Sequence, residues 1–357
     1  MERPVSKPIG TSLYYLDTPA LFINKANIQA NISKVDRIFT ESNKFLRPDM
    51  SIHGSPTLGQ IQIQADHSKG IYVHTLSQAL KFSEAGYRDI TIGMPVIGSG
   101  KSTFALEMSR DIKISIPITN LNNAKNISHM FSESGMEILF YVPISNSIKS
   151  IGLSMTDDIT GLVNEIKRLG NLKFNGYFVV NNEDQNIIDE TFNSQLSSLI
   201  ESTSSTQSTH LNMAISSSNI DQDLGKYSLF DEIINGTYLF DSSNEDFDIP
   251  ACGVLSSVMS HPEENNWYLD CGQKAISIDR GLPTINKSIG VKVDRMSAEH
   301  GCIVSTGTEK IDLKLGDRII LNPANIGDAF NLYDFINVID DGKLTNVWTT
   351  EARGHYR

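Results

Sequence analysis

The stretch Leu46-Arg47-Pro48-Asp49-Met50-Ser51-Ile52-His53-Gly54-Ser55-Pro56 decides how the rest of this chain is interpreted. It begins on the apolar pair Phe45-Leu46, passes through charged and polar residues, and ends in a glycine and a proline. This pattern predicts the end of a buried strand that runs into a loop. In a parallel α/β barrel, reactive side chains lie in such loops, at the carboxyl ends of the strands.

Alternating strand and helix patterns surround this stretch. Apolar residues at helical spacing predict helices over residues 24–39, 58–63 and 157–169. Thr75 supplies a hydroxyl at the predicted start of another helix. Apolar runs predict strands at residues 70–74, 89–93, 113–118, 137–144, 172–180 and 211–215. This alternation indicates a TIM-type parallel α/β barrel, whereas short alternating runs after about residue 252 indicate a β domain.

Composition limits the kinds of partner to expect. The 357 residues are 39% hydrophobic and 20% charged, which is typical of a soluble globular chain. The sequence has no run of eighteen apolar residues, so no membrane partner is expected. The net charge of −12 and the absence of a Lys/Arg cluster argue against nucleic acid. Three widely spaced cysteines, Cys252, Cys271 and Cys302, favour a reducing compartment, and we expect a cytoplasmic location.

The stretch around Ser51 resembles the segment that holds the cofactor lysine in the D-threonine aldolase and D-serine dehydratase family. That family uses pyridoxal phosphate on an alanine-racemase-like barrel, with the pattern Leu/Val-Arg-Pro-His-x-Lys-Thr-His-Lys-Ser-Pro. Arg47, Pro48, His53, Ser55 and Pro56 fit this pattern. Further segments also look like the family: Thr75–Val96, Asn235–Tyr238, Asp270–Asp279, Glu299–Gly301, Leu315–Arg318, Trp348 and Arg353–Gly354.

The resemblance implies a three-part organisation. Residues 1–20 would form an N-terminal segment that packs on the β domain, residues 21–245 the alanine-racemase-like barrel, and residues 246–357 the C-terminal β domain. In this family the barrel of one chain meets the β domain of another. The resemblance therefore also implies a twofold symmetric homodimer.

The reacting group of the family is missing here. Ser51 stands at the lysine position, and Asp49 stands where the family has histidine. A Schiff base needs a primary amine that can lose its proton, and a serine hydroxyl cannot form one. We therefore expect no bound pyridoxal phosphate.

The phosphate site implied by the resemblance is only half kept. Ser216-Ser217-Ser218-Asn219 replaces a glycine-rich loop, and losing glycine costs the close approach of backbone to phosphate. Gly236, Thr237 and Tyr238 still match the second part of the cup. Together with Arg47, these residues are the predicted, degenerate cofactor-binding positions. The family's ring contacts near residues 143–147 and 182–185 are also replaced.

The family's metal pair is absent as well. Asn325 and Gly327 stand at the ligand positions, where one side chain is a poor zinc ligand and the other is missing. Asp328 is expected on the opposite face of a strand. His300 and Cys302 would share a strand face, but two ligands without a partner motif do not predict a metal site. Gly100-Lys101-Ser102 resembles a P-loop end, yet Pro95 replaces its first glycine, which argues against a nucleotide.

Three functional hypotheses remain open. The first is a non-catalytic relative, a pseudoenzyme that keeps the scaffold, a small-molecule pocket in the barrel mouth and a regulatory role, alone or beside an active paralogue. The second is a cofactor-independent enzyme in the same pocket that uses Asp49, His53, Glu183 and His300 as acid-base groups. The third is a lyase, an aldolase or dehydratase of D-3-hydroxy amino acids, that recruits another lysine such as Lys149 or Lys274.

Overall fold

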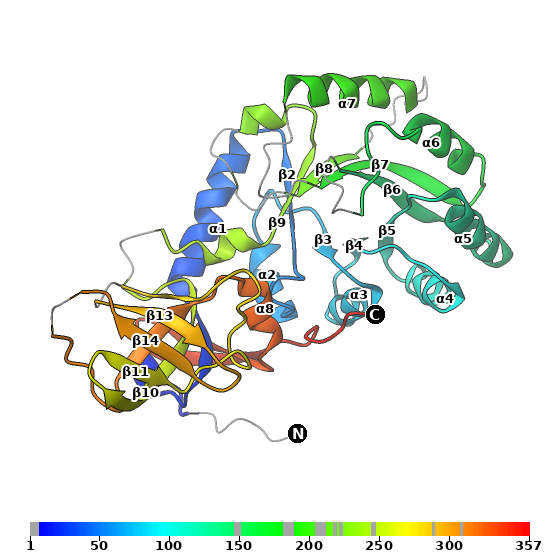
Figure 1. The fold of residues 1–357 in the computed structure, drawn as a ribbon. Coiled ribbons are helices and arrows are strands. Elements are labelled where there is room, and N and C mark those ends of the chain that lie inside the picture. Colours follow the sequence, from blue (N-terminus) through cyan, green and yellow to red (C-terminus); the bar gives the residue numbers. More distant parts are fainter. Residues whose placement is uncertain are drawn as a thin grey trace. The chain divides into compact units, whose positions relative to one another are not determined.

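The computed structural model describes residues 7–145, 151–180, 189–203, 212–216, 220, 224–243, 248–287, 290–307 and 310–357. The chain divides into two compact units (Figure 1). The barrel unit comprises residues 34–51, 59–238 and 355–357, and the β unit comprises residues 1–33, 52–58 and 239–354. Among the described residues, none of the helices combines the length and apolar character needed to cross a bilayer.

The barrel unit is an eight-stranded parallel sheet. Its strands are β2 (Phe45–Pro48), β3 (Ile71–Val73), β4 (Asp89–Ile92), β5 (Lys113–Pro117), β6 (Ile138–Ile144), β7 (Leu172–Val180), β8 (Asn212–Ser216) and β9 (Glu232–Asn235). They follow the order β2-β9-β8-β7-β6-β5-β4-β3. Isolated parallel bridges from Leu46 to Ser68 and from Asp49 to Tyr72 join the two ends of the sheet. The closed parallel barrel predicted from the sequence is confirmed.

Helices connect successive strands of this sheet and lie along its outer side (Figure 1). They are α3 (Leu76–Glu84), α4 (Ser99–Met108), α5 (Leu121–Ser134), α6 (Ile159–Lys167) and α7 (Glu190–Thr203). Helices α1 (Lys25–Thr40) and α2 (Pro56–Gln62) run from the β unit into the barrel unit. Thr75 caps α3 as predicted, because its hydroxyl accepts a hydrogen bond from Gln78 N while the Gln78 side chain bonds back to Thr75 N.

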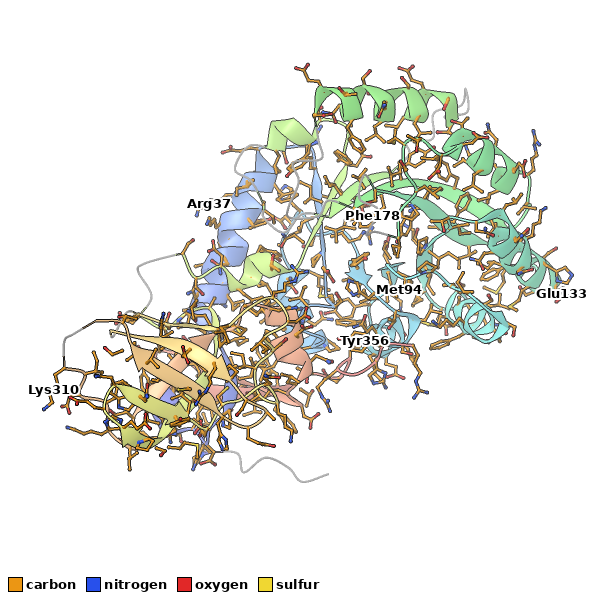
Figure 2. The ribbon with its side chains drawn as sticks, viewed as in Figure 1. Arg37, Met94, Glu133, Phe178, Lys310 and Tyr356 are labelled. Atoms are coloured by element: carbon orange, nitrogen blue, oxygen red, sulfur yellow. The ribbon has the colours of Figure 1, made fainter. Side chains whose placement is uncertain are left out.

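Bulky side chains fill one layer of the barrel interior. Tyr72, Tyr141, Phe178 and Ile234 form a buried cluster. The Phe178 ring, labelled in Figure 2, stacks on Tyr72 at 5.8 Å and meets Tyr141 edge-on at 5.6 Å, both between ring centroids. The Tyr141 hydroxyl donates to Ile92 O at 2.6 Å, which satisfies the phenol inside an apolar layer.

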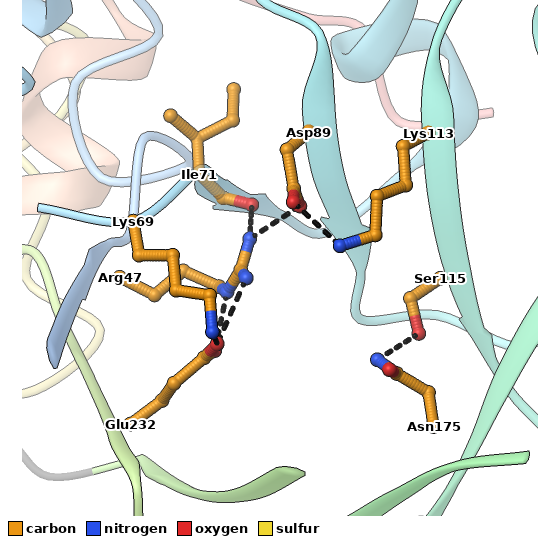
Figure 3. A network of polar contacts seen from close by, with 8 residues as sticks. All are labelled: Arg47, Lys69, Ile71, Asp89, Lys113, Ser115, Asn175 and Glu232. Carbon is orange, nitrogen blue, oxygen red and sulfur yellow. Dashed lines mark hydrogen bonds and ion pairs between the residues drawn. The ribbon is translucent and has the colours of Figure 1, made fainter. Parts of the chain in front are cut away.

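A polar layer lies at the amino-terminal ends of the strands (Figure 3). Arg47 is 3% exposed, and its guanidinium binds both oxygens of Glu232 at 2.7 and 3.1 Å. It also binds Asp89 Oδ1 at 3.0 Å and Ile71 O at 3.3 Å. Lys113 binds the other Asp89 oxygen at 2.8 Å. These contacts link strands β2, β3, β4, β5 and β9 from inside the barrel.

The β unit is built on a nine-stranded sheet whose main path is β13-β14-β11-β10-β1-β16-β17. Off this path, β15 pairs with β10 and β12 pairs with β15. Its strands are β1 (Ala20–Asn24), β10 (Cys252–Glu263), β11 (Asn266–Leu269), β12 (Thr284–Ile285), β13 (Val291–Met296), β14 (Gly301–Ser305), β15 (Arg318–Asn322), β16 (Phe335–Asp340) and β17 (Lys343–Thr349). A short helix, α8 (Ile326–Asn331), follows β15. The hydrophobic core of the β unit includes Leu13, Phe22, Leu255, Ile339 and Leu344.

Strand β1 lies in this sheet, which differs from the expected barrel boundary at residue 21. Its residues pair antiparallel with β10 and parallel with β16. All five residues of β1 are buried. A fully buried strand reads as a continuous apolar run, and such a run fits the middle of either sheet. The first barrel strand is therefore β2, which ends beside Asp49 and Ser51.

The Arg47 network generates a prediction about stability. Replacing Arg47 by Met leaves the buried Glu232 carboxylate without its partner, so we expect the free energy of unfolding to fall by about 3–5 kcal/mol. Denaturant unfolding followed by circular dichroism measures this change. Lys81→Met, which removes the surface pair with Glu84, is the control and should change stability by less than about 1 kcal/mol. Equal effects of the two substitutions would contradict the assignment.

Candidate functional site

The hydroxyl of Ser51 is hydrogen-bonded to the carboxylate of Asp49 directly after β2. Asp49 Oδ1 accepts hydrogen bonds from the Ser51 backbone N at 2.9 Å and from the Ser51 hydroxyl at 2.5 Å. This is an Asx-type turn, in which an aspartate side chain holds the backbone two residues on. The Asp49 N donates to Asn235 O at 3.0 Å, and Met50 N donates to Tyr72 O at 2.9 Å. The position of the turn is therefore set by strands β9 and β3 on either side.

The neighbours of Asp49 make this strand end an acid-base cluster. Burial raises the pKa of the Asp49 carboxyl above its usual range, while the charge of His74 and the Ser51 hydrogen bonds act in the opposite direction. The exposed His74 follows β3, and its ring meets Tyr72 edge-on at 5.7 Å. Burial, with Asp49 adding to it, also raises the pKa of Tyr72 well above its usual range. His74 was not predicted as a site residue, although it directly follows the apolar run of β3 in the sequence.

The other predicted acid-base residues lie elsewhere. His53 belongs to the β unit, is 1% exposed, and accepts a hydrogen bond from Ser55 N on Nδ1 at 3.0 Å. His300 also belongs to the β unit, is exposed, and closes a turn with Ser297 just before β14. Glu183 and Lys149 lie outside the described residues. Of the predicted group, Asp49 and Ser51 are therefore the two that the described part of the chain places in contact.

The described phosphate-site residues bind other parts of the protein. Arg47 is directed to Glu232 and Asp89, the first residues of β9 and β4, which is the opposite end of the barrel from Ser51. Asn235 Oδ1 accepts from Thr237 Oγ1 at 3.3 Å and from Tyr238 N at 2.9 Å. These bonds close the turn around Gly236. Ser216 ends β8, and Ser217, Ser218 and Asn219 lie outside the described residues.

Comparison with known proteins gives this site a context. Residues 251–339 match the family model of a putative serine dehydratase domain. A D-threonine aldolase of Arthrobacter sp is 26% identical, over 99% of this chain and 97% of the relative. A 3-hydroxy-D-aspartate aldolase of Paracoccus denitrificans is 22% identical, over 95% of this chain and 92% of the relative. The chain is similar to these aldolases over nearly its whole length.

Solved structures place the fold in the same group. The D-threonine aldolase of Filomicrobium marinum superposes with a TM-score of 0.87 at 21% identity, covering 99% of this chain and 100% of that one. An alanine racemase of Clostridium difficile 630 superposes with a TM-score of 0.67 at 12% identity, covering 94% and 99%. These similarities confirm the predicted fold, an alanine-racemase-like barrel with a C-terminal β domain.

The described residues of this chain do not fit pyridoxal phosphate. Position 51 carries a hydroxyl whose proton is directed at Asp49, and the Arg47 guanidinium is paired with carboxylates. Three lysines of the described barrel are bound at the other end: Lys69 to Glu232, Lys113 to Asp89, and Lys44 to Tyr227 O and Phe230 O. Lys274 is exposed in the β unit and pairs with Glu299. No step through this cofactor follows from these residues.

The residues at the metal positions do not fit a divalent ion either. Asn325 is the N-cap of α8, with Oδ1 accepting from Asp328 N at 3.3 Å and Nδ2 donating to Asp328 Oδ2 at 2.7 Å. Gly327 lies inside that helix. Among the described residues, no cluster of three His, Cys, Asp or Glu side chains could hold a metal. The strand predicted here is a helix because Asn325 caps it, a signal that the sequence carried.

A cavity of about 360 Å³ in the β unit was not predicted. It is lined by Gln273, Ser277, Ile278, Asp279, Asp328, Asn331 and Leu332. Ser277 Oγ donates to Asp328 Oδ2 at 3.2 Å, so one lining carboxylate is held by the segment that precedes β12. The lining mixes carboxylate, amide and apolar groups. The described side chains that line it form no cluster that defines a reaction.

The capping role of Asn325 gives a prediction that separates it from a metal ligand. Asn325→Ala removes the cap of α8, and we expect the protein to lose about 1 kcal/mol of stability. Asn325→Asp keeps the cap and should behave like the native chain. Elemental analysis should find no stoichiometric zinc or manganese in any of the three proteins. One tightly held ion per native chain, lost in Asn325→Ala, would refute the assignment.

Proposed function

We propose that this chain is a non-catalytic member of the lyase family, a pseudoenzyme that keeps the alanine-racemase-like scaffold without imine chemistry. The observation that carries the proposal is the Ser51 hydroxyl, which stands at the lysine position and donates to Asp49 at 2.5 Å. A hydroxyl supplies no imine nitrogen. The structural role of that position is now the turn itself.

The filled barrel interior limits where a ligand of this chain could bind. Tyr72, Tyr141 and Phe178 occupy the layer below Asp49, and their rings contact one another. Below that layer, a cavity of about 20 Å³ lies between Arg47, Asn175 and Glu232. This volume suits about one water molecule. A ligand of this chain would therefore bind in the barrel mouth, around the loops that follow the strands.

The second candidate is a lyase that acts on D-3-hydroxy amino acids. The names of the relatives, D-threonine aldolase and 3-hydroxy-D-aspartate aldolase, favour it. This candidate needs a lysine that takes over the role of position 51. Lys149 is the candidate outside the described residues, and Lys274 is the candidate in the β unit. The two hypotheses differ in whether any native lysine forms an imine.

A cofactor test decides between the two candidates. We expect the purified protein to show no visible absorbance band from a pyridoxal imine. After borohydride reduction and digestion, mass spectrometry should find no phosphopyridoxyl-lysine, since Ser51 cannot form one. An active D-threonine aldolase processed in parallel is the positive control. A reduced adduct on Lys149, Lys274 or any other native lysine would replace the pseudoenzyme proposal with the relocated-lysine lyase.

The proposed assembly is a twofold homodimer. Two exposed segments of the β unit support it because they lie side by side: Gln273 N donates to Ser297 O at 2.8 Å, and Lys274 N donates to Ala298 O at 3.0 Å. They match the family more closely than the catalytic positions do. A twofold dimer would use the same surface of both chains in an isologous interface. A scaffold role, including pairing with an active paralogue, would use the same surface.

Sedimentation at micromolar concentration tests the dimer. We expect a mass near twice the 39.5 kDa of the chain. Lys274→Glu places like charge beside Glu299 in the proposed interface and should shift the mass towards one chain. Lys101→Glu, on the exposed side of α4, is the matched control and should leave the mass unchanged. A native mass near that of one chain would count against the dimer.

We also propose a cytoplasmic location. The three cysteines support it, because each is free and buried. Burial raises the pKa of the Cys271 thiol to about 12, so this thiol stays protonated and unreactive. Thiols kept in this state are typical of a reducing compartment.

A further inference from the structure

We propose that the Asp49 carboxylate controls which side chain can function at position 51. It favours a side chain that keeps its proton, such as serine, and excludes a neutral amine there. The inference rests on the proposed loss of imine chemistry and adds its physical cause. The resemblance puts histidine at position 49 and lysine at position 51. In this interpretation, Asp49 and Ser51 are one coupled replacement rather than two separate losses.

The geometry binds the two side chains to each other. One oxygen, Asp49 Oδ1, receives both the Ser51 backbone N–H and the Ser51 hydroxyl. The backbone bond holds residue 51 in place whatever side chain it carries. Any donor that begins at the Ser51 Cβ therefore starts within reach of the carboxylate. A lysine ammonium there would form an ion pair with Asp49 through the same turn.

The surroundings give the carboxylate little competing charge. Among the described groups that interact with Asp49, His74 is the one whose charge lowers the pKa of the carboxyl, and it is exposed at the end of β3. Tyr72 faces Asp49 from the same strand, and Tyr141 lies behind Tyr72 on β6. Burial raises the pKa of both phenols well above the usual range, so both stay neutral and neither adds charge of its own. An amine at position 51 would therefore be the nearest strong cation.

Imine formation needs the amine without its proton. An opposite charge within about 4–6 Å stabilises the charged form of an ionisable group by about 1–3 pKa units. Burial raises the pKa of Asp49, but a cation beside the carboxyl favours its ionised form. An amine beside the ionised carboxylate would thus be deprotonated about tenfold to a thousandfold less often than the same amine without it. A serine hydroxyl meets the opposite requirement, because it donates a proton and keeps it. The Asp49 carboxylate and a reactive amine are therefore incompatible at this turn.

The direct test introduces the amine with and without the carboxylate. The variants are Ser51→Lys and the double variant Asp49→Asn, Ser51→Lys, each incubated with pyridoxal phosphate as an aldehyde probe, reduced with borohydride and digested. Labelling at position 51 is measured by mass spectrometry relative to the exposed Lys101 in the same digest. We expect the double variant to be labelled at least about tenfold faster than the single one. Equal labelling, or no labelling of either folded variant, would overturn the proposal.

A smaller substitution keeps the proposal testable if a lysine disturbs folding. Ser51→Cys is nearly isosteric, and its alkylation by iodoacetamide reports the thiolate fraction as a function of pH. The midpoint should lie about one unit or more lower when Asp49→Asn is added, because the carboxylate disfavours a thiolate. The native chain, whose cysteines are buried, measures the background. Coincident midpoints would show that Asp49 does not control position 51.

These outcomes are separate from those of the cofactor test. A reduced adduct on a native lysine of the unmodified chain refutes the pseudoenzyme proposal and leaves the Asp49 effect intact. Rapid labelling of the Ser51→Lys single variant refutes the Asp49 effect and leaves the native chain without an imine. Circular dichroism of each variant shows that the comparison is made between folded proteins.

Discussion

The buried guanidinium of Arg47 is the interaction on which the barrel depends most. Through Glu232, Asp89 and Ile71 it joins strands on both sides of the seam where the eight-stranded sheet closes. A buried charge of this kind is costly unless every donor is paired, and here the carboxylates satisfy it. Asp89 keeps a lowered pKa although burial alone would raise it, because Arg47 and Lys113 outweigh the burial. The ionised Asp89 carboxylate therefore stabilises the folded state above the usual pKa of an aspartate. This contribution is lost as the pH falls through the lowered pKa of Asp89.

That closure also positions the candidate site. Once β2 is held between β9 and β3, its end is fixed by the bonds from Asp49 N to Asn235 O and from Met50 N to Tyr72 O. Asp49 and His74 come together because neighbouring parallel strands end on the same edge. The polar layer at one end of the barrel and the acid-base cluster at the other are thus parts of one arrangement. Arg47, expected at the phosphate site, serves the first of these layers.

The sequence predicted most helices and strands, but it did not predict which sheet contains strand β1. The barrel, the β domain and the Thr75 cap follow from periodicity and local hydrogen bonding, which are properties of short segments. Strand β1 could not be assigned in this way, since a continuous apolar run is compatible with burial in either sheet. The partners of Arg47 were equally invisible, because Glu232 lies 185 residues away along the chain. The Asp49–Ser51 hydrogen bond could have been predicted from the sequence, since an aspartate side chain commonly binds the backbone N–H two residues later in a turn.

The two positions where the family carries its reactive groups share one physical solution in this chain. At the end of β2, Asp49 holds the backbone N of Ser51, and at the start of α8, Asn325 holds the backbone N of Asp328. In both places a short polar side chain satisfies a local amide that begins a turn or a helix. Such bonds stabilise the backbone without any ligand, so each segment keeps its conformation when no cofactor organises it. At both positions the side chain therefore serves the backbone, which is the arrangement that the proposed non-catalytic scaffold requires.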